Sequence, residues 1–172
     1  MEHMKDGELA VFLSGEIIRK SADDDHPFYA NRNFVYLTGI DQRDSILMLY
    51  KEAGKSEEKL FILAPDAFEE RWNGARIKPD EAAGRSGIGD IVYFDEWQSY
   101  LAEMIRRNQI RSIYLDIDHK EGRRNWNGAD WMKQYIETGY PQIEIKNSLP
   151  ILKKMRLIKK PCEIEALERA EQ

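Results

Sequence analysis

The sequence predicts an α/β domain with a mixed central sheet of about six strands flanked by helices, ending in a linker helix. Short apolar runs of strand length, bounded by turn residues, alternate along the chain with segments of helical periodicity. Such alternation is typical of a sheet whose faces are covered by helices. A polar connection between two of the runs indicates a hairpin, so we expect antiparallel and parallel strands in one sheet.

Six segments have the length and composition of strands: residues 9–13, 45–50, 59–64, 90–94, 112–117 and 142–145. The polar connection between the second and third, residues 52–58, predicts the hairpin. The fourth and fifth flank a helical segment. We therefore expect these two strands to form a βαβ unit with the usual right-handed crossover.

Helical patterns occupy residues 31–38, 66–72, 79–85, 96–107, 128–137 and 149–158. The pattern is clearest in 96–107, where an apolar stripe lies opposite charged residues and is expected to pack on the sheet. The stripe consists of Trp97, Leu101, Met104 and Ile105.

A last helix is predicted from Pro161, because proline suits the first helical position and Glu163 lies near the positive end of the helix dipole. Ile164 and Leu167 give this helix an apolar edge that needs another surface to cover it. We therefore divide the chain into a domain at residues 1–148 and a junction segment at 149–172 that leads into a further unit.

Composition narrows the class of protein. The 172 residues, 42% hydrophobic and 33% charged, are typical of one soluble folded domain, and the net charge of -5 argues against a nucleic-acid binder. No apolar run is long enough to cross a membrane. The one cysteine, Cys162, cannot form an internal disulfide, and the N-terminus lacks the pattern of a signal peptide, so we expect a cytoplasmic location.

Three polar motifs have alternative interpretations. The run from Asp23 to His26 has metal-ligand residue types, but a solvated acidic loop explains it better. Asp116, Asp118 and His119 follow a predicted strand, where a capped strand end is favoured over a metal site. The glycine-rich segment 84–89 precedes a strand, so it is interpreted as a helix stop and turn rather than a phosphate loop. The sequence predicts no catalytic residue and no metal ligand.

Three motifs in order carry a resemblance to a known family. They are the run Phe34-Val-Tyr36-Leu37-Thr38-Gly39, the run Trp72-Asn-Gly74-Ala-Arg76, and the tail at residues 154–170. Together they resemble the N-terminal domain of aminopeptidase P, the Xaa-Pro aminopeptidases of the creatinase and prolidase superfamily. The tail is similar to the family's junction into its catalytic domain.

The resemblance implies a creatinase/prolidase-like N-terminal fold in a larger metallopeptidase. The parent hydrolase would remove an N-terminal residue that precedes proline, using a C-terminal pita-bread domain and two divalent metal ions, expected to be manganese. Their ligands would come from that domain, so this chain itself would hold no cofactor. Its own part would be to help build a homodimer or homotetramer and to form a wall at the active site that contacts the peptide substrate.

The resemblance also suggests site residues. Trp72 would be a rim aromatic lying against a substrate proline, with packing in the core as the alternative, and Arg76 would be a carboxylate partner. Asn33 stands where some relatives carry an acidic residue at an interdomain contact, and Arg156 matches the junction arginine. Lys160 replaces the family's Ser or Thr at the N-cap of the last helix, which weakens the helix start by about 1 kcal/mol.

Two other parents fit the same motifs: a prolidase, or a protein of this superfamily that binds peptides or proteins without catalysis. A search of the parent's downstream sequence for the five metal ligands, two aspartates, a histidine and two glutamates, separates an enzyme from a binding protein.

Overall fold

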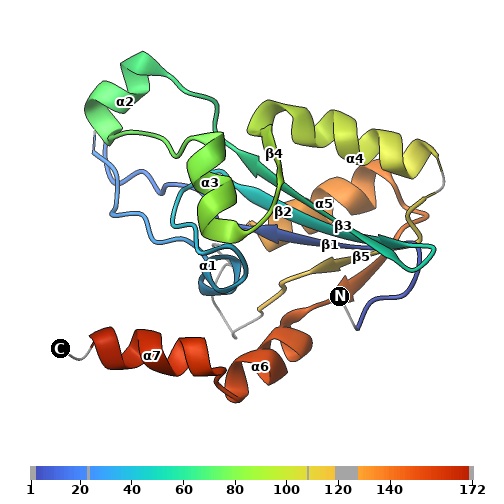
Figure 1. The fold of residues 1–172 in the computed structure, drawn as a ribbon. Coiled ribbons are helices and arrows are strands. Elements are labelled where there is room, and N and C mark those ends of the chain that lie inside the picture. The colour runs from blue at the N-terminus through green and yellow to red at the C-terminus, as the bar shows by residue number, and fades with distance from the viewer. Residues whose placement is uncertain (1–2, 23, 108, 119–127, 171–172) are drawn as a thin grey trace.

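A mixed six-stranded sheet lies at the centre of the fold (Figure 1). The computed structural model describes residues 3–22, 24–107, 109–118 and 128–170. The sheet has the order β4-β3-β2-β1-β5-β6. The strands are β1 (Glu8–Leu13), β2 (Ile46–Glu52), β3 (Lys55–Ile62), β4 (Asp90–Tyr93), β5 (Ser112–Leu115) and β6 (Glu144–Asn147). β2 is antiparallel to both of its neighbours and the remaining pairs are parallel, which confirms the predicted fold class.

The predicted hairpin is confirmed, with a shorter turn than the sequence suggested. Glu52 of β2 pairs with Lys55 of β3, so only Ala53 and Gly54 form the turn. Both have positive φ, 49° and 75°, as the tightest β-hairpin turns require. The first half of β3 is exposed and charged, and it therefore lacks the apolar alternation that marks a strand in sequence.

The predicted βαβ unit is present as two parallel strands of one sheet joined through a helix, but the two strands are not neighbours. β4 pairs with β3 at the sheet edge while β5 pairs with β1, so β3, β2 and β1 lie between the two strands. The connection between β4 and β5, through the short turn η1 (Phe94–Glu96) and α4 (Trp97–Arg106), therefore crosses half of the sheet. The two strands are parallel, but apolar periodicity identifies a strand without identifying its neighbour.

Helices cover both faces of the sheet (Figure 1). One face carries α4 and α5 (Ala129–Gly139), and the other carries α1 (Arg32–Thr38), α3 (Pro79–Ser86) and α6 (Leu149–Leu157). Alternation in β1 sends Leu9 and Val11 into the first core and Ala10 and Phe12 into the second. The predicted stripe of α4 is buried, as expected: Trp97, Leu101, Met104 and Ile105.

Two helices stand apart from these cores. No residue of α2 (Ala67–Asn73) or of α7 (Pro161–Ala170) is buried. Figure 1 shows α7 extending away from the sheet toward the C-terminus, with Ile164 46% and Leu167 54% exposed. By contrast, α6 contributes Leu152 to the second core, so the start of the predicted junction segment packs on the domain, and the division at residue 148 stays a prediction. No described helix is long and apolar enough to span a membrane.

Candidate functional site

α2 presents Trp72 to solvent. The helix begins where the Asp66 carboxylate accepts hydrogen bonds from the backbone N–H groups of Phe68 and Glu69, at 3.0 and 3.1 Å. These bonds, led by the one from Glu69, lower the pKa of the Asp66 carboxyl, so the cap stays charged in mild acid. Trp72 lies in the last turn and is 74% exposed, with Phe68 one turn earlier 73% exposed. Packing of Trp72 in the core of this domain is therefore ruled out, and its role at a substrate rim stays a prediction.

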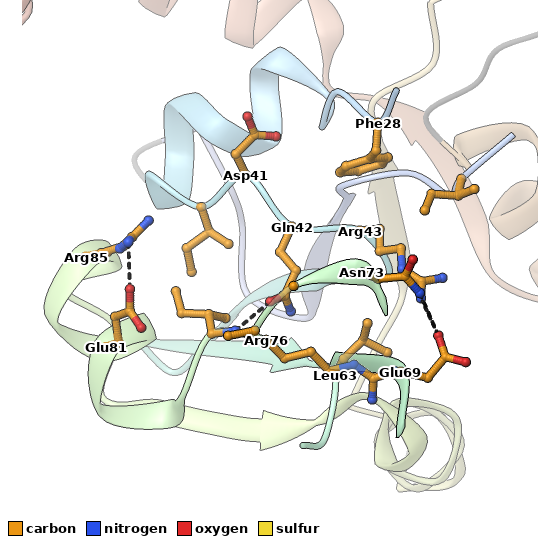
Figure 2. Close-up of a pocket in the computed structure, with 15 residues that line it drawn as sticks. Phe28, Asp41, Gln42, Arg43, Leu63, Glu69, Asn73, Arg76, Glu81 and Arg85 are labelled. Carbon is orange, nitrogen blue, oxygen red and sulfur yellow. Dashed lines mark hydrogen bonds and ion pairs between the residues drawn. The ribbon is translucent and has the colours of Figure 1, made fainter. Parts of the chain in front are cut away.

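Arg76 lies beside a cavity of ≈ 460 Å³ between α2, residues 40–43 and α3 (Figure 2). Its Nη1 donates a hydrogen bond to the backbone carbonyl of Ala64 at 2.5 Å. Charged and polar side chains of the cavity are Asp41, Gln42, Arg43, Glu69, Asn73, Arg76, Glu81 and Arg85. The sequence predicted a carboxylate partner for Arg76, and the structure gives it a carbonyl of its own chain; whether it also meets a substrate carboxylate stays a prediction.

The two predicted junction residues lie together. Arg156 on α6 donates from Nη1 to Oδ1 of Asn33 on α1 at 2.7 Å, and its guanidinium carbon lies 5.7 Å from the ring centroid of Tyr36. Asn33 in turn donates from Nδ2 to Asp116 at 2.9 Å. A hydrogen-bonded chain thus links α6, through the start of α1, to Asp116 directly after β5, and an interdomain role of Asn33 and Arg156 stays a prediction.

Sequence reasoning missed Asn31 as a member of this network, and it singled out Asp116 without its partners. Asn31 caps α1 by accepting from the backbone N–H of Asn33 at 2.8 Å, and its Nδ2 donates to Asp116 at 3.0 Å. Asp116 is 3% exposed and follows β5 directly. A capped strand end was the favoured interpretation of Asp116. The structure shows that its carboxylate accepts hydrogen bonds from the side-chain amides of Asn31 and Asn33. An aspartate directly after an apolar strand was the sequence signal for Asp116. Nothing in the sequence marked Asn31 and Asn33 as its partners, because they lie far away along the chain.

The other motifs behave as surface or turn elements where they are described. Asp23 and His119 lie outside the described residues. Asp24 pairs with Lys20 at 2.6 Å. Gly87 adopts φ 74° and ends α3, which confirms the predicted helix stop and turn. Among the described residues, no three His, Cys, Asp or Glu side chains are grouped so as to hold a metal ion.

The start of α7 lacks a capping hydroxyl, as the sequence indicated. Glu163 instead reaches back, and its Oε2 accepts from the backbone N–H of Lys160 at 2.8 Å. This bond is half of a capping box and replaces part of what a Ser or Thr at position 160 would supply.

A protein-family comparison decides the relationship. The family model described as "Aminopeptidase P, N-terminal domain" matches residues 1–114 of the 172. The chain belongs to this family. The resemblance seen in the sequence motifs is therefore confirmed. The matched residues include β1 to β4, most of β5, and the helices α1 to α4.

Full-length relatives extend the match across the whole chain. Human Xaa-Pro aminopeptidase 3 is 27% identical over 94% of this chain, and the Xaa-Pro aminopeptidase of Escherichia coli is 26% identical over 99%. An aminopeptidase P structure from Bacillus anthracis matches 95% of the chain with a TM-score of 0.89 and 30% identity. The E. coli aminopeptidase P in its low-pH form matches 98% with a TM-score of 0.76 and 27% identity.

This aminopeptidase P N-terminal domain spans only 32–39% of the length of these relatives and solved chains. It is therefore the N-terminal domain of a larger protein, and any catalytic role belongs to the parent.

Proposed function

We propose that the parent protein is a metal-dependent Xaa-Pro aminopeptidase, which removes an N-terminal residue preceding proline. The names of the full-length relatives support this activity. The reaction would take place in a C-terminal pita-bread domain holding two divalent ions, which we propose to be manganese. Such ions activate a water molecule and polarise the peptide carbonyl. We assign this domain no chemical step, because the family resemblance implies that the metal ligands come from the catalytic domain.

This domain is proposed to form the wall of the active site, with Trp72 as the contact to the peptide. The observation that carries the proposal is an indole 74% exposed on a capped helix that has no buried residue. Exposure of an apolar indole surface to water is unfavourable, and covering that surface lowers the free energy. Aromatic rings are well suited to packing on a proline ring. In a homodimer or homotetramer, which we also propose, that surface belongs to the active site of a second subunit.

The junction is proposed to set the angle between the two domains. The Arg156–Asn33 hydrogen bond holds α6 against α1, and the residues that follow leave an apolar surface for the catalytic domain to cover. That surface consists of Leu157, Ile158, Ile164 and Leu167, which are between 46% and 82% exposed. We further propose a cytoplasmic location, supported by the single, exposed cysteine.

Steady-state kinetics of the full-length protein with manganese test the proposal, using Xaa-Pro peptides of two to six residues. Trp72→Ala is expected to lower kcat/KM for longer peptides by about threefold to tenfold, the equivalent of about 0.5–1.5 kcal/mol for an aromatic contact. Arg71→Ala is the matched control, since Arg71 is an exposed neighbour on α2 without a polar partner among the described residues.

Three results would each contradict a part of the proposal. Absence of Xaa-Pro hydrolysis with any divalent ion, in a protein that binds peptides, favours the binding protein over the enzyme. Cleavage restricted to dipeptides favours a prolidase. An unchanged kcat/KM in Trp72→Ala removes the rim role while leaving the activity of the parent in place.

A further inference from the structure

We infer that Arg76 is a positioning residue that fixes the orientation of Trp72 by closing the base of the segment that carries it. This segment, residues 65–76, is called here the α2 arm. It leaves the sheet after β3 and returns before α3. The inference rests on the proposed rim role of Trp72, and it adds a residue that would govern which peptides the wall can contact.

The α2 arm is attached to the domain by polar contacts rather than by a core. No residue of α2 is buried, and the ≈ 460 Å³ cavity lies beneath it. Arg43 approaches Glu69 of the arm at 3.4 Å, and the backbone N–H of Ile77 donates to Gln42 Oε1 at 2.7 Å. Since a helix without buried residues has no apolar packing to hold it, these few polar contacts determine where Trp72 points.

Arg76 joins the two ends of the arm. Ala64 is the last residue before the arm and Arg76 is its final residue, so the 2.5 Å bond from Nη1 to the Ala64 carbonyl closes a loop across 12 positions. The donor is charged, which makes this bond stronger than one between neutral groups. Figure 2 shows Arg76 and Gln42 among the residues that line one cavity.

The Arg76 charge also acts on carboxylates at both sides of the base. The Glu69 and Phe68 backbone N–H groups lower the pKa of the arm's Asp66, and Arg76 adds to this lowering. Burial raises the pKa of Asp44 on the body of the domain, and Arg43 and Arg76 oppose that rise. A neutral side chain at position 76 would weaken both attractions along with the hydrogen bond.

Gly74 lets the chain turn back so that Arg76 can reach Ala64. It follows α2 directly with φ 86° and ψ 164°, a conformation that is essentially limited to glycine. A Cβ at this position would meet nothing within 4 Å, so the constraint comes from the backbone and not from crowding. Gly74→Ala therefore offers a second way to disturb the same closure.

Hydrogen exchange of the full-length protein, followed by mass spectrometry, tests the closure directly. Arg76→Gln is expected to raise exchange rates within residues 65–77 about tenfold, with β2 unchanged, because a charged donor at the base of the arm is lost. Arg76→Lys should restore slow exchange, since one bond to a carbonyl needs only one charged donor. Arg71→Gln is the control on the same helix and should leave exchange as it is.

Kinetics then separate positioning from mere structure. Arg76→Gln should raise KM for longer peptides by about the factor seen in Trp72→Ala. Trp72→Ala with Arg76→Gln together should be no worse than Trp72→Ala alone, because Arg76 acts through the indole. Gly74→Ala gives the same readouts if the Gln variant does not fold.

Different outcomes overturn different claims. Unchanged exchange in Arg76→Gln and in Gly74→Ala refutes the closure, whether or not the parent is a peptidase. Faster exchange combined with an unchanged KM, in a protein whose KM does respond to Trp72→Ala, refutes the positioning role. A parent without peptidase activity refutes the proposed function while the exchange result still stands.

Discussion

Replacing Trp72 and Trp97 by alanine should separate an exposed contact residue from a core residue in the isolated chain. With Trp72 74% exposed, about a quarter of roughly 250 Å² is covered, which at about 25 cal/mol per Å² gives an upper limit of about 1.5 kcal/mol. The better helix propensity of alanine offsets about 0.5 kcal/mol of this loss in the free energy of unfolding. Trp72→Ala should therefore lower the free energy of unfolding by about 1 kcal/mol or less.

Trp97 provides the contrast. It is 4% exposed, and its ring lies edge-on to Trp131 and Tyr135 with centroids 5.6 and 5.3 Å away. Truncation should cost about 3–5 kcal/mol, the usual range for removing a large aromatic from a core. Urea denaturation followed by far-UV circular dichroism measures both variants against the wild type. A loss in Trp72→Ala as large as that in Trp97→Ala would show that the indole packs within the domain and would refute the exposed-rim reasoning.

Two further predictions concern charge and the C-terminal helix. Burial raises the pKa of the Glu8 carboxyl, but hydrogen bonds from Lys146 and the Lys5 backbone outweigh it and the pKa falls below 4.5. The ionised Glu8 carboxylate therefore stabilises the fold above its pKa in the unfolded chain. This stabilisation is lost as the pH falls through the lowered pKa of the folded state. Glu8→Gln should lower the free energy of unfolding by about 2 kcal/mol at pH 7, and it should make stability depend less on pH under acidic conditions. Glu144→Gln, which changes an exposed partner of the same lysine, should have neither effect. Residues 161–170 should exchange their amide hydrogens rapidly in dilute monomer, because a helix of this length with no buried residue is marginal in water. Slow exchange there in a confirmed monomer would contradict the junction interpretation.

Local patterns predicted most elements of this domain, because a helix or a buried strand is encoded in neighbouring residues. The stripe of α4 and the stop at Gly87 are examples. Strand partners are not local, which is why the sequence did not show that β4 pairs with β3 and β5 with β1. β6 also begins two residues later than expected, because Ile143 is buried ahead of the strand while the strand itself is partly exposed.

The candidate sites show the same division. Exposure of Trp72 could not be read from its sequence, since aromatic residues near the end of a helix occur both in cores and at surfaces. Asn33 and Arg156 were identified separately. They lie 123 positions apart in the sequence, and only the folded structure shows that their side chains are hydrogen-bonded. The partner of Arg76 is a backbone carbonyl, which every residue has and which no residue type therefore marks.

The central place of β1 has a consequence for the order in which the chain can fold. β1 pairs with β2 early in the sequence, but its other neighbour, β5, begins about 100 residues later, and the second core closes only with Leu152. Contacts of such long sequence separation form late, because the loop between them must first be closed. During synthesis the hairpin side of the sheet can assemble first, with one edge of β1 left open until β5 emerges. Once Leu152 has left the ribosome, every strand and both cores of this domain can be completed.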